Sequence, residues 1–302
     1  MKAESSGAAK RYMTCHRPIP NAQGMGIWGD RAYVLYNTGS CAVFDLKSRS
    51  RKPLDVFPLG SYNVGKPSKD YLNHANSCMF STSHLDGNPI PLLYVTVGTG
   101  VGADTDGYFY RCAVENIVEE ADGCFTAETV QTITYNPEGT LPAGVEHPCW
   151  GSPCMMVDND GGFLYMFSAR YRTKRDCVPE GEENAYLITK FPLPDPTLGG
   201  MVRLRPEDIL DQFAVPSQVL FTQGGTIHNG LLYYTYGCPK IGYPVQIMVF
   251  DLKNKSLAAE TGDLSDAFCG EEIECCAYYQ GKLLCNTCDG SIFEIQEGLL
   301  PL

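Results

Sequence analysis

Polar side chains recur at the start of five short apolar segments of this chain. They supply amides, an imidazole, a carboxyl group and an indole, and they belong to Gln23, His74 with Asn76, Trp150 with Ser152, Gln223, and Glu274. Amide and imidazole groups form hydrogen bonds with hydroxyls, and an aromatic face stacks on a sugar ring. If these side chains meet, they suit a glycan or another small polar ligand. Alternatively, they only satisfy one another's hydrogen bonds, as buried polar groups must.

A repeated unit indicates how these side chains could meet. Residues 23–47 begin with Gln-Gly, continue into an aromatic strand after a tight turn, and close on Val-Phe-Asp-Leu-Lys. Residues 223–253 repeat the same order, with a turn at Asn229-Gly230. One supersecondary unit used more than once indicates an array fold.

Turn residues at regular spacing divide the chain into five such units, and almost no segment has helical periodicity. The units span about 22–60, 73–136, 150–222, 223–264 and 272–296. The first four contain four strand-like segments each, whereas the fifth contains three. A lone strand at 10–16 can supply the missing outer strand, which leaves no open sheet edge. We therefore predict an all-β, five-bladed β-propeller that forms one domain over residues 1–302, with a β-sandwich or a six-bladed propeller as alternatives.

Two further expectations concern the third unit. Pro206 followed by acidic residues predicts a short helix over residues 205–213. The segment 217–222 is then expected to be the last strand of this unit.

Long loops indicate which face of the propeller carries a site. They are expected on the face where the inner strands begin, at 60–73, 99–106, 137–150, 170–184, 237–244 and 265–273. Function concentrates on elaborated loops that a rigid scaffold holds. We therefore place the site on this face.

One of these loops carries a basic cluster, which consists of Arg170, Arg172, Lys174 and Arg175. Such a cluster can clamp a phosphate or a carboxylate, so Arg170 is a candidate ligand contact. The alternative is a solvated loop whose positive charges balance the neighbouring glutamates.

The fourteen cysteines are scattered, and we interpret most of them as buried reduced thiols that act as small hydrophobes. Cys275, Cys276, Cys285 and Cys288 resemble a zinc set, but adjacent strand residues point to opposite faces. Folding the hairpin about Gln280-Gly281 places Cys276 opposite Cys285, so packing is favoured over a disulfide and over zinc. A calcium loop at Asp104 and Asp106 lacks the required downstream glutamate. We predict no metal site and no cofactor.

A catalytic alternative rests on Glu274. Saccharide hydrolysis needs two carboxyl groups about 5–10 Å apart, and only Glu274 is acidic among the inner-strand starts. Asp70 or Glu146 on adjoining loops could supply the second group. We favour a non-catalytic binding propeller, keep a saccharide-active hydrolase or lyase as the alternative, and keep a protein-interaction scaffold with a large apolar patch as a third hypothesis.

The net charge and the hydropathy of the chain limit the classes of partner that it can bind. The chain has 23 basic and 35 acidic residues and a net charge of −12, which argues against binding to nucleic acid or to an anionic membrane. There is no apolar run long enough to cross a membrane, so we expect no membrane insertion. No signal peptide is visible, so the compartment stays open between the cytoplasm and secretion with a removed leader. The oligomeric state also stays open.

The opening Gln-Gly, the Tyr-x-x-Tyr strand and the closing Phe-Asp-Leu strand resemble a broad group of bacterial five-bladed propellers. This group includes the helveticin J-like proteins and the receptor-binding propellers related to teichoic-acid proteins. The segment His74-Ala75-Asn76 before a Leu-Leu-Tyr-Val strand also resembles uncharacterised propellers of gut Bacteroidetes. The resemblance covers nearly the whole chain as a blade pattern. It implies the fold and, by analogy, binding to surface glycans, and it implies no catalytic residue.

Overall fold

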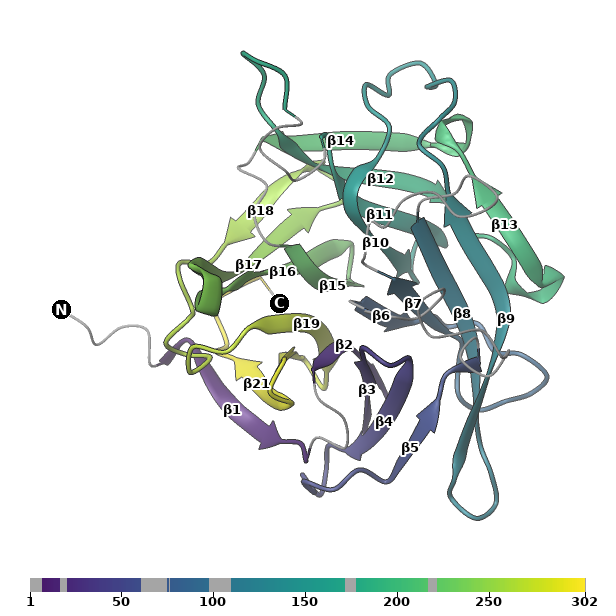
Figure 1. Cartoon of the computed structure of the whole chain (residues 1–302), viewed down its shortest axis with the longest axis vertical. Helices are drawn as coiled ribbons and strands as arrows, with labels where there is room; N and C mark the ends of the chain where they lie inside the picture. Colours follow the sequence, from purple (N-terminus) through teal and green to yellow (C-terminus); the bar gives the residue numbers. More distant parts are fainter. Residues whose placement is uncertain are drawn as a thin grey trace.

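Five small sheets stand in a ring in the computed structural model of this chain (Figure 1). Each sheet is a blade, and its strands follow one another outward from the centre of the ring. The fold is the five-bladed β-propeller that the repeat pattern predicts. The residues that the structure describes are 7–16, 21–60, 75, 77–97, 110–171, 178–216 and 222–301.

The strands follow the blades in chain order, with one exception. Blade one contains β2 (Ala22–Trp28), β3 (Arg31–Tyr36), β4 (Ser40–Asp45) and β5 (Asp55–Pro58). Blade two contains β6 (Ser77–Phe80), β7 (Leu93–Val97), β8 (Tyr110–Glu119) and β9 (Phe125–Tyr135), and β13 (Gly200–Leu204) joins its outer edge. Blade three contains β10 (Trp150–Asp158), β11 (Phe163–Ala169), β12 (Ala185–Pro192) and β14 (Asp211–Pro216). Blade four contains β15 (Thr222–His228), β16 (Leu231–Cys238), β17 (Tyr243–Asp251) and β18 (Ser256–Glu260).

The fifth blade closes the ring with strands from both ends of the chain. It contains β19 (Ile273–Tyr279), β20 (Lys282–Thr287), β21 (Ser291–Ile295) and, as its outer strand, β1 (Ala9–Thr14). The strands β1 and β21 pair antiparallel from Ala9 opposite Ile295 to Thr14 opposite Ser291. The predicted closure by the N-terminal strand is therefore confirmed.

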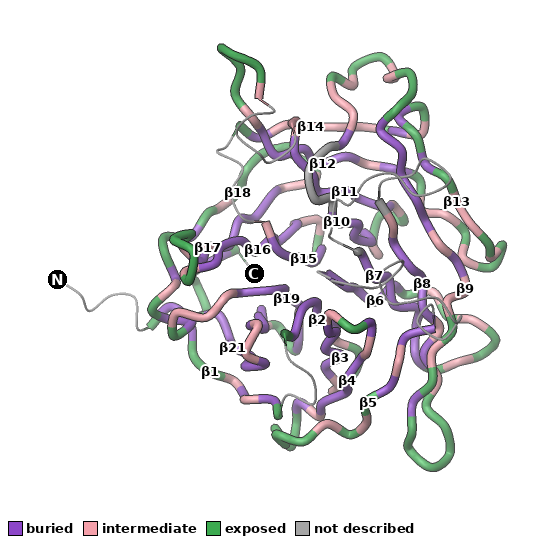
Figure 2. Tube along the Cα trace, in the orientation of Figure 1, coloured by how far each residue is buried: buried purple, intermediate pink, exposed green. Residues whose placement is uncertain are grey.

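Alternating side chains hold neighbouring blades together. On β3, Tyr33 packs in a core cluster with Phe80 of blade two, while the adjacent Val34 packs in another cluster with Leu284 of blade five. The period of two residues sends successive side chains to opposite faces of each sheet, so one strand serves two interfaces. Figure 2 shows the result, in which the inner strands are buried and exposure rises at the turns and outer edges.

The inner strands approach closely near the centre of the ring. Ser77 Oγ of β6 donates to the carbonyl oxygen of Gly225 in β15 at 3.3 Å, and it lies 3.8 Å from the sulfur of Cys275 in β19. Gly225 also lies tightly against the next strand of its own blade, because a Cβ at this position would lie 2.4 Å from the carbonyl oxygen of Tyr233 in β16. We call the contacts of Ser77 the central plug, and they separate the two ends of the ring.

Blade three corrects two expectations. Within 205–213 the structure forms only a 3₁₀ turn, η5 (Pro206–Asp208), after which β14 begins at Asp211. The outer strand of the blade is therefore β14 and does not lie at 217–222; residues 217–221 lie outside the described part. Pairing with β12, with Phe213 opposite Ile188, overrides the local signal for a helix start. The Pro-rich connection carries η4 (Pro196–Leu198) and the parallel strand β13, and a third 3₁₀ turn, η6 (Pro239–Ile241), follows β16.

Candidate functional site

Four inner strands are bulged near their starts. The pairing register shifts between Ala22 and Met25, between Trp150 and Cys154, between Thr222 and Gly225, and between Ile273 and Cys275. Three of the residues expected to line the site, Gln23, Gln223 and Glu274, lie at these shifts. Bulges redirect side chains and are common beside functional sites. The same irregularity at the same point of four blades therefore gives these side chains a different direction from the rest of their strands.

Neighbouring blades bring polar groups together at this end of the ring. The side-chain amide of Gln223 donates to Oε1 of Glu272 at 2.7 Å. Donor atoms of Glu272, Glu274 and Cys288 all lie within 4.8 Å of one another. We call Gln23, Gln223, Glu272, Glu274 and Cys288 the strand-start cluster.

Burial controls the protonation of this cluster. Glu274 is only 2% exposed. Burial, together with the negative charge of Glu272, raises the pKa of the Glu274 carboxyl well above its usual value. Burial and the same two glutamates also raise the pKa of the Cys288 thiol. The Glu274 carboxyl therefore keeps its proton to a higher pH than an exposed glutamate does, and in its protonated form it can donate a hydrogen bond.

Gln23 extends the cluster toward blade one. Its amide nitrogen donates to its neighbour's carbonyl oxygen, that of Ala22, at 3.1 Å. Its carbonyl Oε1 is buried and has no hydrogen-bond partner among the described residues, and the same holds for Oδ1 of Asn286. Asn286 in turn donates to the backbone carbonyl of Gln23 at 2.5 Å. These two oxygens are therefore buried acceptors whose hydrogen-bonding capacity is unused among the described residues.

The other predicted site residues are placed as follows. His74 and Asn76 lie outside the described residues. Trp150 begins β10, where its backbone pairs with Ala169, and its side chain is not among those described. Arg170 donates from Nη1 to the carbonyl of Glu183 at 3.2 Å, so it braces its own loop, and the rest of the basic cluster lies outside the described residues.

The second carboxyl group is not one of those expected. Asp70 lies outside the described residues, and Glu146 is exposed beside His147. Glu272 is instead the neighbour of Glu274. The hairpin arithmetic that pairs Cys276 with Cys285 also brings Cys288 beside Glu272, and the Cys288 amide donates to the Glu272 carbonyl at 3.0 Å. The register of this hairpin can be read from the sequence, and it indicates that Glu272 and Cys288 are neighbours.

Glu272, Glu274 and Cys288 are the described residues that could hold a metal ion. Two carboxyl oxygens and a thiol sulfur match the ligands that zinc accepts. Metal binding requires deprotonated ligands, and the raised pKa values of Glu274 and Cys288 oppose it at neutral pH. The four cysteines considered from the sequence do not form a set, because Cys276 faces Cys285 while Cys275 faces Asn286.

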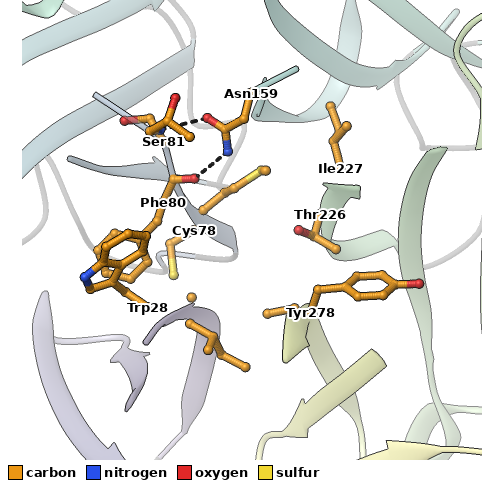
Figure 3. Close-up of a pocket in the computed structure, with 13 residues that line it drawn as sticks. Trp28, Cys78, Phe80, Ser81, Asn159, Thr226, Ile227 and Tyr278 are labelled. Atoms are coloured by element: carbon orange, nitrogen blue, oxygen red, sulfur yellow. Dashed lines mark hydrogen bonds between the residues drawn. The ribbon is translucent and has the colours of Figure 1, made fainter. Parts of the chain in front are cut away.

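A separate pocket lies at the opposite end of the ring, where the inner strands end (Figure 3). It has a volume of about 190 Å³ and its lining includes Trp28, Phe80, Thr226, Ile227 and Tyr278. We call it the strand-end pocket. The long loops of the sequence predict a site on the other face, and no pattern in the sequence indicates this pocket.

Comparisons with known proteins identify no family for this chain. No family model matches the chain, and no curated protein is similar to it in sequence. Similar solved structures include a glutaminyl cyclase from Myxococcus xanthus, with 13% identity, a TM-score of 0.49 and 95% of each chain covered. Raptor from Chaetomium thermophilum has 11% identity and a TM-score of 0.42, over 98% of this chain and 30% of that chain. At these values we transfer no function from either protein.

The described residues contain no helix that is long and apolar enough to cross a membrane.

Proposed function

We propose that this propeller binds a small polar ligand, such as a glycan or another hydroxylated molecule, at the strand-start cluster. The observation that supports this proposal most is the buried Glu274 carboxyl with its raised pKa, which lies within 4.8 Å of donor atoms of Glu272 and Cys288. A protonated carboxyl donates one hydrogen bond, whereas the free oxygens of Gln23 and Asn286 accept. Hydroxyl groups both donate and accept, so they match this combination. His74, Asn76, Trp150 and Arg170 remain proposed contacts of the same ligand.

A glycan-array screen, followed by a thermal-shift panel of the sugars that bind, tests this proposal. The variants Gln23→Ala and His74→Ala/Trp150→Ala should each weaken binding at least tenfold. Gln23→Ala keeps the backbone carbonyl that accepts from Asn286. Thermal melts of both variants establish that they are folded. Trp28→Ala, at the other end of the ring, is the matched control and should bind as the wild type does. Undiminished sugar binding in both variants would show that the ligand binds elsewhere.

A second candidate function is acid–base chemistry on a bound saccharide. The observation that favours it is the presence of Glu272 within 4.8 Å of Glu274. Two carboxyl groups whose environments differ can divide the acid and base roles, and retaining glycosidases place such groups about 5–5.5 Å apart. Glu274 would be the proton donor and Glu272 its partner.

Release of reducing ends from oligosaccharides distinguishes the two functions. Glu274→Gln and Glu272→Gln should each abolish turnover if the pair is catalytic. Glu271→Gln is the control. Glu271 is the neighbour of Glu272 in the sequence, but its carboxylate forms an ion pair with Lys240 at 2.6 Å and is not part of the Glu272–Glu274 pair. Sugar binding without any turnover by the wild type would leave only the binding function.

A further inference from the structure

The strand-end pocket lies on the other side of the central plug from the strand-start cluster. Cys78 and Thr226, which line it, directly follow the plug residues Ser77 and Gly225 in their strands. Its walls come from the ends of β2, β6, β15 and β19, and Asn159 lies after β10. All five blades therefore contribute to one concave site that the proposed function does not use.

Aromatic residues line two opposite walls of the pocket. In Figure 3, Trp28 and Phe80 lie on one side of the gap and Tyr278 lies on the other. His84 makes an edge contact with Trp28 at 6.0 Å between ring centroids, and His228 stacks on Tyr278 at 3.9 Å. The imidazoles support the two rings from behind, so the walls are positioned before a ligand arrives.

The lining carries no charged side chain. Asn159 is fully engaged, because its amide nitrogen donates to the Phe80 carbonyl at 3.0 Å and its Oδ1 accepts from the Thr82 amide at 2.9 Å. The Thr226 hydroxyl makes no hydrogen bond with another described residue, and Figure 3 shows it turned toward the gap. The site therefore offers apolar and aromatic contact together with the Thr226 hydroxyl.

The volume sets the size of the ligand. A cavity of about 150 Å³ with apolar walls holds a benzene molecule. At about 190 Å³ the strand-end pocket has room for one aromatic ring with a small substituent. A sugar needs several polar partners, which this lining does not supply, and an ionised ligand would lose its hydration without gaining a counter-charge.

We propose that the strand-end pocket binds a small, neutral, single-ring aromatic molecule of the phenol class. The ring lies between the Trp28 and Tyr278 walls, and the phenol hydroxyl forms a hydrogen bond with Thr226 Oγ1. This site is independent of the proposed polar-ligand site, because the central plug lies between them.

Isothermal titration with p-cresol and toluene tests the proposal on the full chain. The wild type should bind both, with p-cresol the tighter. Trp28→Ala should weaken both ligands at least tenfold; this residue is 38% exposed, so its loss leaves a core that can still fold. Thr226→Val keeps the shape of the side chain and removes its hydroxyl. It should weaken p-cresol about three- to tenfold and leave toluene unchanged.

Leu198→Ala is the control, because Leu198 is 81% exposed and lies outside the pocket. Binding of p-cresol that is unchanged in Trp28→Ala, or absent in the folded wild type at millimolar concentration, would overturn the proposal. An equal loss of p-cresol and toluene in Thr226→Val would overturn the assigned orientation. Saturating methyl glucoside should not displace p-cresol, and a failure of sugar binding alone would affect only the function proposed for the strand-start cluster.

Discussion

The side-chain amide of Gln223 donates a 2.7 Å hydrogen bond to Oε1 of Glu272, which joins the bulged start of β15 to the residue just before β19. This bond fixes Glu272 beside the buried carboxyl of Glu274. Two acidic groups that close together favour the protonated form of the more buried one. The hydrogen bond between blades four and five therefore has a direct electrostatic consequence for the strand-start cluster.

Gln223→Glu replaces the hydrogen bond from Gln223 to Glu272 with repulsion between two acidic groups, while the side chain keeps its size. The new carboxyl group removes the donor and adds a third acidic group to the cluster. We expect a destabilisation of about 1–2 kcal/mol at pH 8, or a few degrees in Tm, and a smaller loss at pH 5. Thermal melts at both pH values measure it. Gln223→Leu is the uncharged control, and an equal loss at both pH values for the two variants would contradict the electrostatic explanation.

Glu274 makes the free energy of unfolding decrease as pH rises. Its pKa is raised in the folded chain from a usual value near 4.5, because burial and Glu272 disfavour the charged form. The stability that it contributes is fully present below the unfolded pKa and is lost as pH rises through the folded pKa. Over that interval the loss is at most about 1.4 kcal/mol per pH unit.

Glu274→Gln removes this titration. The variant should be more stable than the wild type at pH 7, and the difference in unfolding free energy should grow as pH rises above about 4.5. Chemical denaturation from pH 5 to pH 8 measures the difference. Glu115 is a second buried carboxyl with a raised pKa, and Glu115→Gln is the matched comparison, because Glu115 accepts hydrogen bonds from Thr129 and from the Gly60 amide. A variant difference that stays constant with pH would show that Glu274 is ionised in the folded chain.

The closure of the ring was predictable because it follows from counting strands. Alternating apolar residues and tight turns mark each hairpin in the sequence. Four units have four strands each and the fifth has three, so β1 has one place to go, at the outer edge of the fifth blade. Blade three was less predictable. Pro206 and the acids after it indicate a helix start, whereas the pairing of Phe213 with Ile188 depends on strands far away in the chain. Local propensity cannot report such a partner.

The candidate site was predictable in the same limited way. Gln23, Gln223 and Glu274 were found from their place at the start of repeated strands. Glu272 and Cys288 were missed, although the hairpin register already brought them together. The strand-end pocket had no local signal, because its walls are the ends of several strands that meet only in the closed ring.

Removal of residues 1–16 tests the closure directly. Met13 is 5% exposed and Cys15 is 3% exposed, and the deletion uncovers the edge of β21. We expect a loss of several kcal/mol and aggregation through the open edge. Thermal melts and light scattering measure both effects. Removal of residues 1–6 alone keeps β1 whole and is the control, and an unchanged Tm in the longer deletion would disprove closure by β1.

Alkylation distinguishes the exposed cysteines from the buried ones. Cys124 and Cys269 are exposed, whereas Cys276 and Cys285 are buried and have pKa values that burial raises. The thiolate is the reactive form, so both burial and the raised pKa values slow the reaction. Iodoacetamide followed by peptide mass spectrometry should label Cys124 and Cys269 in the folded chain, and Cys276 and Cys285 only after unfolding. Rapid labelling of Cys276 in the native chain would contradict the packing of β19 against β20.

The central plug provides the last prediction. Gly225→Ala adds a Cβ that would lie 2.4 Å from the carbonyl oxygen of Tyr233 and 2.7 Å from Cδ2 of Tyr234. The first contact is with the backbone of β16, which cannot rotate away, so β15 must move relative to β16. We expect a destabilisation of about 3 kcal/mol. Gly262→Ala is the matched control, because a Cβ there meets nothing within 4 Å.

The same displacement would reach both ends of the ring. Gln223 lies two residues before Gly225 and Thr226 lies one residue after it, so a shift of β15 moves a member of the strand-start cluster and a wall of the strand-end pocket together. Denaturant titrations measure the stability, and p-cresol titration of the folded fraction measures the pocket. A Gly225→Ala variant as stable as Gly262→Ala would mean that β15 and β16 are not packed as closely at Gly225 as the structure shows.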